Sequence, residues 1–125
     1  MAVHGLDHVN ILTVDIDGTK RFYKTLLGLV EGVPPPLPAG IEAHWLVDAT
    51  GHPIIHLQRV ENANVGNVAG SIHHVALKCD DFDTMRARCE EMGVNFMVNS
   101  FESAKFRQLL VTDPNNVLLE MNFTG

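Results

Sequence analysis

A repeat of about 62 residues is the feature of this sequence that most limits its possible folds. Residues 8–17 read HVNILTVDID and residues 74–83 read HVALKCDDFD, and the two segments align without a gap at an offset of 66. In both copies a helical pattern follows and closes on Leu-Gly-Leu or Met-Gly-Val. A chain of 125 residues has the length of one ordinary domain. The repeat therefore predicts a single domain, residues 1–125, made of two copies of one unit.

The first half of the chain, residues 1–60, has the pattern of one such unit. Alternating β-branched residues predict strands, and an apolar stripe at Phe22, Leu26 and Leu29 predicts an amphipathic helix. A proline-rich run cannot continue a helix or a central strand, and it predicts a stiff extended loop. The expected elements are a strand over 6–14, a helix capped by Asp17 and running to Gly28, the loop over 33–38, and strands over 43–47 and 53–59.

The second half, residues 71–125, repeats this pattern after a polar linker over 61–70. The expected elements are strands over 72–79, 94–98, 107–112 and 117–123 and a helix over 81–92. A turn over 113–116 precedes the last strand, and Asn116 is a residue type that tolerates a positive φ. The order is βαβββ in each half, which predicts a fold of the α+β class.

Four side chains of the kinds that bind metals fall in the same strand phase. Side chains alternate between the two faces of a strand, so the apolar positions mark the face that packs under the helix. The opposite face then carries His8, Asn10, His56, Gln58, His74, Ala76, Glu120 and Asn122. Across the repeat, His8 corresponds to His74 and His56 corresponds to Glu120. Each unit thus contributes two ligand-type residues, one from its first strand and one from its last.

Three imidazoles and one carboxylate suit a divalent transition ion such as Zn, Ni, Fe, Mn or Co. The alternative is that these are four unrelated polar residues on solvated strand faces. The shared phase and the matching repeat positions favour the first interpretation. The sequence therefore predicts a metal site formed by His8, His56, His74 and Glu120.

Four segments resemble the motifs of a known family. FYKTLLGL at 22–29 is similar to the family's helix after the first strand, and LDHV at 6–9 and IHHV at 72–75 are similar to its two histidine-bearing strands. TDPNNVLLE at 112–120 is similar to its final turn and glutamate strand, with Asn116 where glycine is usual. On these motifs the chain resembles the vicinal oxygen chelate superfamily, which includes glyoxalase I, extradiol dioxygenases and bleomycin-resistance proteins.

The resemblance implies a fold in which two tandem βαβββ modules form an open β cup. It also implies that His8, His56, His74 and Glu120 occupy the family's metal positions, where the ion is a Lewis acid toward two adjacent substrate oxygens. Glu120 is then either a permanent ligand or a ligand that also acts as the catalytic base. The implied activity is that of a metal-dependent lyase or isomerase of the glyoxalase type.

Two positions depart from glyoxalase I. His56 stands where that enzyme carries glutamate, so this ligand set has only one carboxylate and leaves a divalent ion with a net positive charge. Leu12 stands where similar bacterial glyoxalase I enzymes carry an arginine that holds the glutathione carboxylate. Leucine cannot hold a carboxylate, which predicts that the substrate does not contain glutathione.

Two other functions remain open. An extradiol dioxygenase needs only two histidines and one glutamate, which His8, His74 and Glu120 supply. A binding protein of the bleomycin-resistance type sequesters a ligand without a metal. The complete set of four ligand-type side chains favours a metal-dependent enzyme, because a metal-free binder has no need of them.

Five further residues are candidates for substrate binding. Asn10 shares the strand phase of the predicted ligands. Trp45 and Phe106 are expected either to line the pocket or to pack in the core. Arg107 and Gln108 begin a strand near the expected mouth of the cup. One of these two is expected to hold an anionic group of the substrate, unless both lie on a solvated edge.

Composition and charge narrow the range of partners that we expect for this protein. The net charge is -6 and the longest basic run is Lys20-Arg21, so no cluster suits a phosphate backbone and nucleic acid is not an expected partner. No apolar stretch approaches the length of a membrane span, and the N-terminus lacks the features of a signal peptide. Two cysteines are too few for a disulfide scaffold. We therefore expect a cytoplasmic protein that does not bind membranes.

A single βαβββ unit leaves an open sheet edge and makes only half of a cup. In small single-chain members of the superfamily, the second unit often comes from a partner chain. The resemblance therefore implies a homodimer whose metal sites are shared between the two chains and which acts on a small-molecule substrate.

Overall fold

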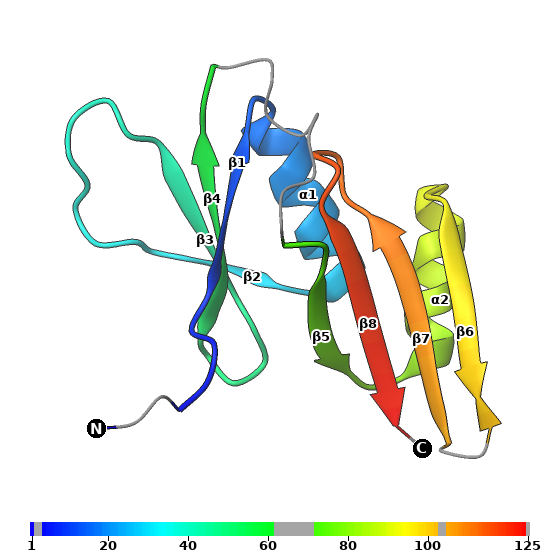
Figure 1. The fold of residues 1–125 in the computed structure, drawn as a ribbon. Helices are drawn as coiled ribbons and strands as arrows, with labels where there is room; N and C mark the ends of the chain where they lie inside the picture. Colours follow the sequence, from blue (N-terminus) through cyan, green and yellow to red (C-terminus); the bar gives the residue numbers. More distant parts are fainter. Residues whose placement is uncertain (2–3, 62–71, 103–104, 125) are drawn as a thin grey trace. The chain divides into compact units, whose positions relative to one another are not determined.

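The structure, a computed structural model, describes residues 1, 4–61, 72–102 and 105–124. In this part of the chain, two helices and eight strands divide between two compact units, Met1–Val65 and Gly66–Gly125 (Figure 1). Each unit has one helix and one four-stranded sheet. The predicted α+β class and the two βαβββ modules are confirmed. The predicted linker over 61–70 lies outside the described residues except for Glu61.

The first unit consists of β1 (Val9–Thr13), α1 (Ile16–Leu27), β2 (Val30–Gly32), β3 (Ala43–Val47) and β4 (Pro53–Arg59). Its strand order is β1-β4-β3-β2, with β1 parallel to β4 and the other neighbours antiparallel. The first and last strands of the unit are therefore hydrogen-bonded neighbours. Sequence patterning did not locate β2, because three residues are too few to display an alternation.

The second unit consists of β5 (Val75–Cys79), α2 (Phe82–Met92), β6 (Phe96–Phe101), β7 (Phe106–Thr112) and β8 (Leu118–Thr124). Its strand order is β5-β8-β7-β6, again with a parallel pair between the first and last strands. The two units thus share one topology, in which β5 corresponds to β1 and β8 to β4. The repeat read from the sequence is therefore a repeat of topology.

The start of the first helix differs from the prediction by two residues. Asp15, and not Asp17, is the N-cap, because Oδ1 of Asp15 accepts a hydrogen bond from the Gly18 backbone N–H at 3.0 Å. Asp17 lies in the first turn, where a negative charge interacts favourably with the helix dipole. The predicted left-handed end is confirmed, since Gly28 has φ 66°.

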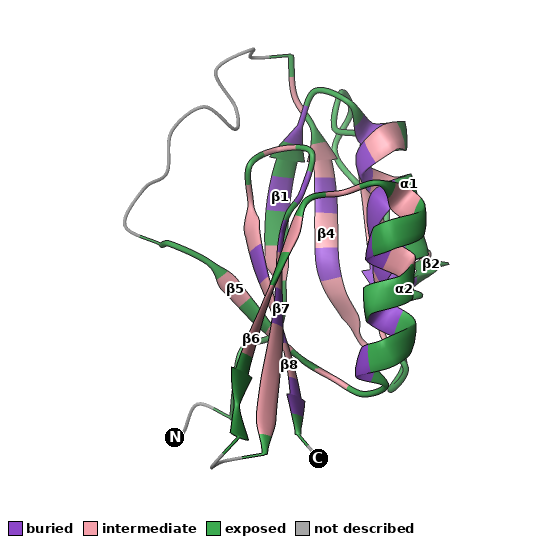
Figure 2. Cartoon of the chain, turned by 90° about the vertical axis from the view of Figure 1, so that its right-hand side faces the viewer, coloured by how far each residue is buried: buried purple, intermediate pink, exposed green. Residues whose placement is uncertain are grey.

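One face of each sheet packs against the helix of the same unit. Helix α1 contacts β3 and β4, and in the second unit the rings of Phe82 in α2 and Phe123 in β8 meet edge to face at 5.3 Å. Figure 2 shows buried residues alternating with less buried ones along β1 and β4. The buried strand residues are Ile11, Thr13, Leu46, Ile55, Leu57, Leu109, Val111, Leu119, Met121 and Phe123. Side chains of the opposite phase lie on the other face of each sheet, which the helix of the unit does not cover. We call it the open face.

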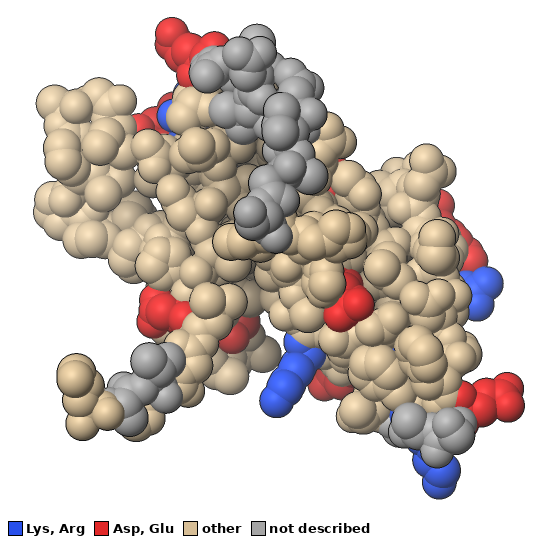
Figure 3. Space-filling model, in the orientation of Figure 1, with Lys and Arg blue, Asp and Glu red and all other residues tan. Residues whose placement is uncertain are grey.

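Neither described helix is long and apolar enough to cross a membrane. On the face drawn in Figure 3, the Lys and Arg side chains stand singly rather than in a patch.

Candidate functional site

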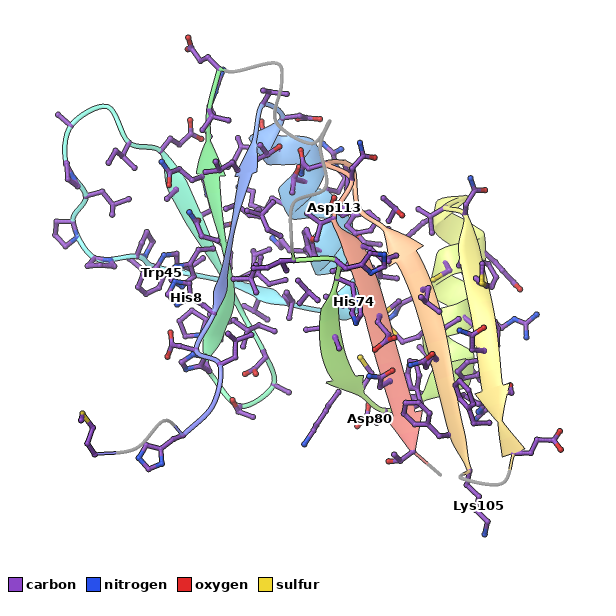
Figure 4. The ribbon with its side chains drawn as sticks, in the orientation of Figure 1. His8, Trp45, His74, Asp80, Lys105 and Asp113 are labelled. Atoms are coloured by element: carbon purple, nitrogen blue, oxygen red, sulfur yellow. The ribbon has the colours of Figure 1, made fainter. Side chains whose placement is uncertain are left out.

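The first unit brings His8 and His56 together on the open face of its sheet. In β4, Ile55 and Leu57 point into the core, so His56 between them points away. His8 lies directly before β1, and its ring stacks on that of His56 with 3.7 Å between centroids and 13° between planes. Trp45, opposite His56 in β3, also stacks on His56, at 4.3 Å and 13°. Because β4 lies between β1 and β3, His56 is held between the two other rings. Figure 4 labels His8 and Trp45, the two residues that stack on it.

The imidazole of His56 is half-buried, and one of its two ring nitrogens lacks a hydrogen-bond partner among the described residues. Its Nε2 atom is buried and has no partner in the part of the chain that the structure describes. Burial, and after it the nearness of His8, lowers the pKa of His56 below its ordinary value of 6.5. A neutral imidazole keeps a lone pair on one ring nitrogen, which is the form that binds a metal. The lowered pKa therefore favours the protonation state that a metal ligand requires.

The pH dependence of stability should report this depressed pKa. In the unfolded chain the histidine pKa is about 6.5, so the unfolded state binds the proton first as the pH falls. The stability contributed by neutral His56 is present above about pH 6.5 and is lost as the pH falls through the folded-state pKa. Urea unfolding of the metal-free protein at a series of pH values measures this loss. The His56→Gln variant should lose less stability over the same range, and an identical loss in both proteins would contradict the assignment.

The second unit brings His74 and Glu120 together in the same way. Leu119 and Met121 are buried in β8, so Glu120 points to the open face with 18% of its side chain exposed. His74 lies directly before β5, and its Nε2 atom is 3.9 Å from Oε2 of Glu120. Two ligands bound tetrahedrally at roughly 2.1 Å lie roughly 3.4 Å apart, so a small side-chain rotation would let both reach one ion.

Asn122 orients the carboxylate of this pair. It follows Glu120 at the next position of the same strand phase, and its Nδ2 atom donates a hydrogen bond to Oε2 of Glu120 at 3.2 Å. Its Oδ1 atom is buried and has no hydrogen-bond partner among the described residues. Buried polar atoms usually have partners, so an unpartnered acceptor beside Glu120 suits a donor from a bound molecule.

The four predicted ligands therefore form two pairs, one in each unit. Within residues 1, 4–61, 72–102 and 105–124, no group of three or more His, Cys, Asp and Glu side chains is arranged to hold a metal ion. Each pair offers two donor atoms of a type that suits a divalent transition ion. The role of His8, His56, His74 and Glu120 as ligands stays a prediction.

Two of the substrate-binding candidates lie on the open face of the first sheet. Asn10 is paired with His56 in the register of β1 and β4, and its Nδ2 atom donates to Oε1 of Gln58 at 3.3 Å. Trp45 covers one side of the His56 ring, as described above, and it is half-buried rather than in the core. Both side chains are thus next to the first pair of predicted ligands, His8 and His56.

The other three candidates divide between the two faces of the second sheet. Gln108 is paired with Asn122, and Phe106 shares its phase, so both lie on the face of Glu120. Arg107 has the opposite phase, and its guanidinium lies 4.0 Å from the centroid of the Phe82 ring in α2. Arg107 and Gln108 were the two residues expected to hold an anionic group of the substrate. Only Gln108 is on the sheet face of the predicted ligand Glu120.

Sequence reasoning did not assign a role to Asp7, which contacts a predicted ligand. Oδ2 of Asp7 lies 2.7 Å from Nδ1 of His8. The available signal was that Asp7 is an acidic residue directly before a ligand-type histidine. The strand predicted over 6–14 includes Asp7 in the opposite phase from His8, so alternation assigned the two side chains to opposite faces. In the structure both residues lie before β1, where alternation does not apply.

Comparison with protein families gives a match over most of the chain. Residues 7–108 match the model of the family described as "Glyoxalase/Bleomycin resistance protein/Dioxygenase superfamily". A protein of Arabidopsis thaliana named Glyoxylase I 4 is 26% identical over an alignment of 125 residues. The alignment covers 93% of this chain and 68% of that protein. The motif resemblance found in the sequence and the family match therefore agree.

Solved structures with the same fold include a glyoxylase/bleomycin resistance protein/dioxygenase domain and fosfomycin resistance proteins. A glyoxylase/bleomycin resistance protein/dioxygenase domain from Frankia sp. EAN1pec has a TM-score of 0.80 at 19% identity, covering 99% of this chain and 94% of that one. A mutant of the fosfomycin resistance protein FosX from Listeria monocytogenes, complexed with Mn(II) and 1S,2S-dihydroxypropylphosphonic acid, has a TM-score of 0.77 at 15% identity. That match covers 99% of this chain and 95% of the FosX chain. At these identities the likeness establishes the fold.

Proposed function

Because the chain belongs to the glyoxalase/bleomycin resistance protein/dioxygenase superfamily, we propose that it is a metal-dependent lyase or isomerase of the glyoxalase type. Its substrate is a small molecule with two adjacent oxygen atoms. The observation that supports this proposal most directly is the arrangement of ligand-type side chains in pairs. His8 and His56 meet on one open sheet face, and His74 and Glu120 meet at the corresponding place in the other unit.

The donor set fits a divalent transition ion of the series Zn, Ni, Fe, Mn and Co. Such an ion, when bound, supplies Lewis-acid stabilisation of negative charge that develops on the substrate oxygens. Glu120 is the one carboxylate of the set, and we assign to it the transfer of a substrate proton as well as ligation. Asn122 fixes the orientation of Oε2 of Glu120, and Trp45 shields one side of His56 from water. The unpartnered Oδ1 of Asn122 is placed to accept a hydrogen bond from a substrate hydroxyl.

A site with four ligands requires a His8–His56 pair and a His74–Glu120 pair to face one another. We propose that this occurs in a homodimer, in which each site takes one pair from each chain. A symmetric dimer then holds two equivalent sites. The open edges of the two four-stranded sheets support this arrangement, because a second unit can cover an exposed edge strand.

Metal content tests the proposed function. Protein purified without a histidine tag, exchanged against each of the five metals and then freed of unbound ion, should retain about one equivalent per chain by elemental analysis. A control at a pH of about 5 should retain less, because protonated imidazoles do not bind metals. A protein that retains no metal under any of these conditions would refute the proposal and favour a ligand-binding protein of the bleomycin-resistance type.

Glutathione hemithioacetals should be poor substrates. Leu12 is 42% exposed on the open face of β1, where it offers no charge to the carboxylates of glutathione. Turnover of the methylglyoxal–glutathione adduct, measured with each metal, should stay far below the ordinary enzyme range of ~10 s⁻¹. Introducing an arginine with Leu12→Arg should raise kcat/KM for the adduct if this position decides the preference. Turnover of ~10 s⁻¹ by the wild-type protein would contradict the prediction.

A further inference from the structure

The residue directly before each predicted ligand histidine contacts the same ring nitrogen of that histidine. Oδ2 of Asp7 is 2.7 Å from Nδ1 of His8. At the corresponding place 66 residues later, Nδ1 of His73 is 3.0 Å from Nδ1 of His74. Since neither His8 nor His74 lies within a strand, sheet hydrogen bonds do not fix their side chains. A contact at Nδ1 in both units therefore requires a different explanation from strand phase.

In the first unit the contact defines the proton position. An ionised carboxylate only accepts hydrogen bonds, so Nδ1 of His8 is the donor. A neutral imidazole carries one proton, so its Nε2 atom then has the free lone pair. The donor–acceptor distance of 2.7 Å is in the range of charge-assisted bonds, which hold a ring more firmly than neutral ones.

Asp7 is itself held from another part of the unit. Nε2 of His52 lies 2.9 Å from the Asp7 backbone oxygen and 3.2 Å from its Oδ1 atom. The backbone oxygen accepts, so His52 is the donor. His52 follows the turn over 48–51 and lies directly before β4, and its own backbone N–H donates to Oδ1 of Asp48 at 3.1 Å. Asp7 is thus connected to the strand that carries His56, although 69% of its side chain is exposed.

In the second unit the same arrangement leaves Nε2 of His74 directed at Glu120. The two rings of His73 and His74 are perpendicular, with centroids 5.3 Å apart, which lets one Nδ1–H point at the lone pair of the other. When His74 donates, its Nε2 atom has the lone pair, and this atom is the one that lies 3.9 Å from Oε2 of Glu120. With His74 as the donor, the nitrogen that faces Glu120 is the one free to bind a metal, whereas with His73 as the donor that nitrogen carries the proton.

We propose that Asp7 and His73 are positioning residues that hold Nδ1 of His8 and of His74 and so present Nε2 of each ring as the metal-binding atom. This inference rests on the proposed metal site. A carboxylate or other acceptor on the second nitrogen of a ligand histidine fixes its tautomer and ring orientation, and removing it typically costs about 10–100-fold in metal affinity. Neither residue needs to touch the substrate to have this effect.

Two measurements test the inference. Nitrogen-15 NMR of the imidazoles in the metal-free protein should show His8 as its Nδ1–H tautomer, and Asp7→Ala should convert it to the mixture typical of a free histidine. Titration of Zn²⁺ against a competing chelator should then give a dissociation constant about 10-fold higher for Asp7→Ala. Asp7→Asn keeps an acceptor oxygen and should restore most of the affinity. Asp17→Ala, which removes an exposed aspartate from α1, should bind Zn²⁺ like the wild-type protein.

The second unit gives an independent comparison. His73→Ala should weaken Zn²⁺ binding and release the tautomer of His74, and His73→Asp should restore both by copying the pair of the first unit. Wild-type affinity in both Asp7→Ala and His73→Ala overturns the inference and leaves the proposed function intact. A wild-type protein that binds none of the five metals, with His8 still in its Nδ1–H form, overturns the proposed function and the metal role of these residues while confirming the hydrogen bond.

Discussion

Replacing His74 with alanine should yield a folded protein with at least about 100-fold weaker binding of a divalent transition ion. Binding free energies of roughly 10–16 kcal/mol for four-ligand zinc sites amount to about 3 kcal/mol for each ligand, and each 1.4 kcal/mol is a factor of about 10 in the dissociation constant. His74 is an exposed residue before β5 and packs into no core, so its loss should leave the free energy of unfolding of the metal-free protein almost unchanged. Competition titration with Zn²⁺ and urea unfolding measure the two quantities.

A matched histidine distinguishes ligation from a general effect of losing an imidazole. His44 in β3 has the opposite phase from Trp45, and its two ring nitrogens lie 2.9 Å from Glu31 and 3.1 Å from Glu42. His44→Ala should therefore leave Zn²⁺ affinity unchanged. Glu120→Gln keeps the shape of the carboxylate but removes its charge, and it should weaken binding about as much as His74→Ala. Full metal occupancy of His74→Ala with the fold intact would exclude His74 as a ligand.

Strand alternation was sufficient to place two of the four predicted ligands, His56 and Glu120, because it is a rigid rule inside a strand. His8 and His74 were predicted inside strands as well, and in the structure each lies directly before one. Once Ile55 and Leu57 are assigned to the core, His56 has only the other face available, and the same holds for Glu120 between Leu119 and Met121. The matching positions of the two units then follow from the repeat. The helices were also predictable, since an apolar stripe and a following glycine mark each of them.

Contacts outside strands were not predictable in this way. The bond from His52 to Asp7 joins residues 45 positions apart and depends on how the turn before β4 approaches the chain before β1. Arg107 is a different case, because it lies within β7 and alternation places it in the phase of the buried Leu109 and Val111, opposite to Gln108. Register between strands, which a single sequence does not encode locally, was needed only to pair Gln108 with Asn122.

Mixing two metal-binding variants should restore sites that neither variant has alone, if the sites are shared between chains. His8→Ala and Glu120→Ala each lack one ligand of every site in their own homodimers. In a mixed dimer with shared sites, one site receives both lesions and the other receives an intact His8–His56 pair and an intact His74–Glu120 pair. Random mixing makes about half of the dimers mixed, so about one quarter of all sites should regain wild-type affinity for Zn²⁺.

The control uses two lesions in the same pair. A mixed dimer of His8→Ala and His56→Ala carries one lesion in each site under any arrangement, so it should recover nothing. The variants are exchanged by partial unfolding and refolding together, and tight Zn²⁺ sites are counted by titration before and after. If each site is built within one chain, the His8→Ala and Glu120→Ala mixture also recovers nothing, because every chain keeps its own lesion. Recovery of a quarter of the Zn²⁺ sites in the first mixture and of none in the second is expected only where each site takes one pair from each chain. A protein that sediments as a monomer would exclude that arrangement directly.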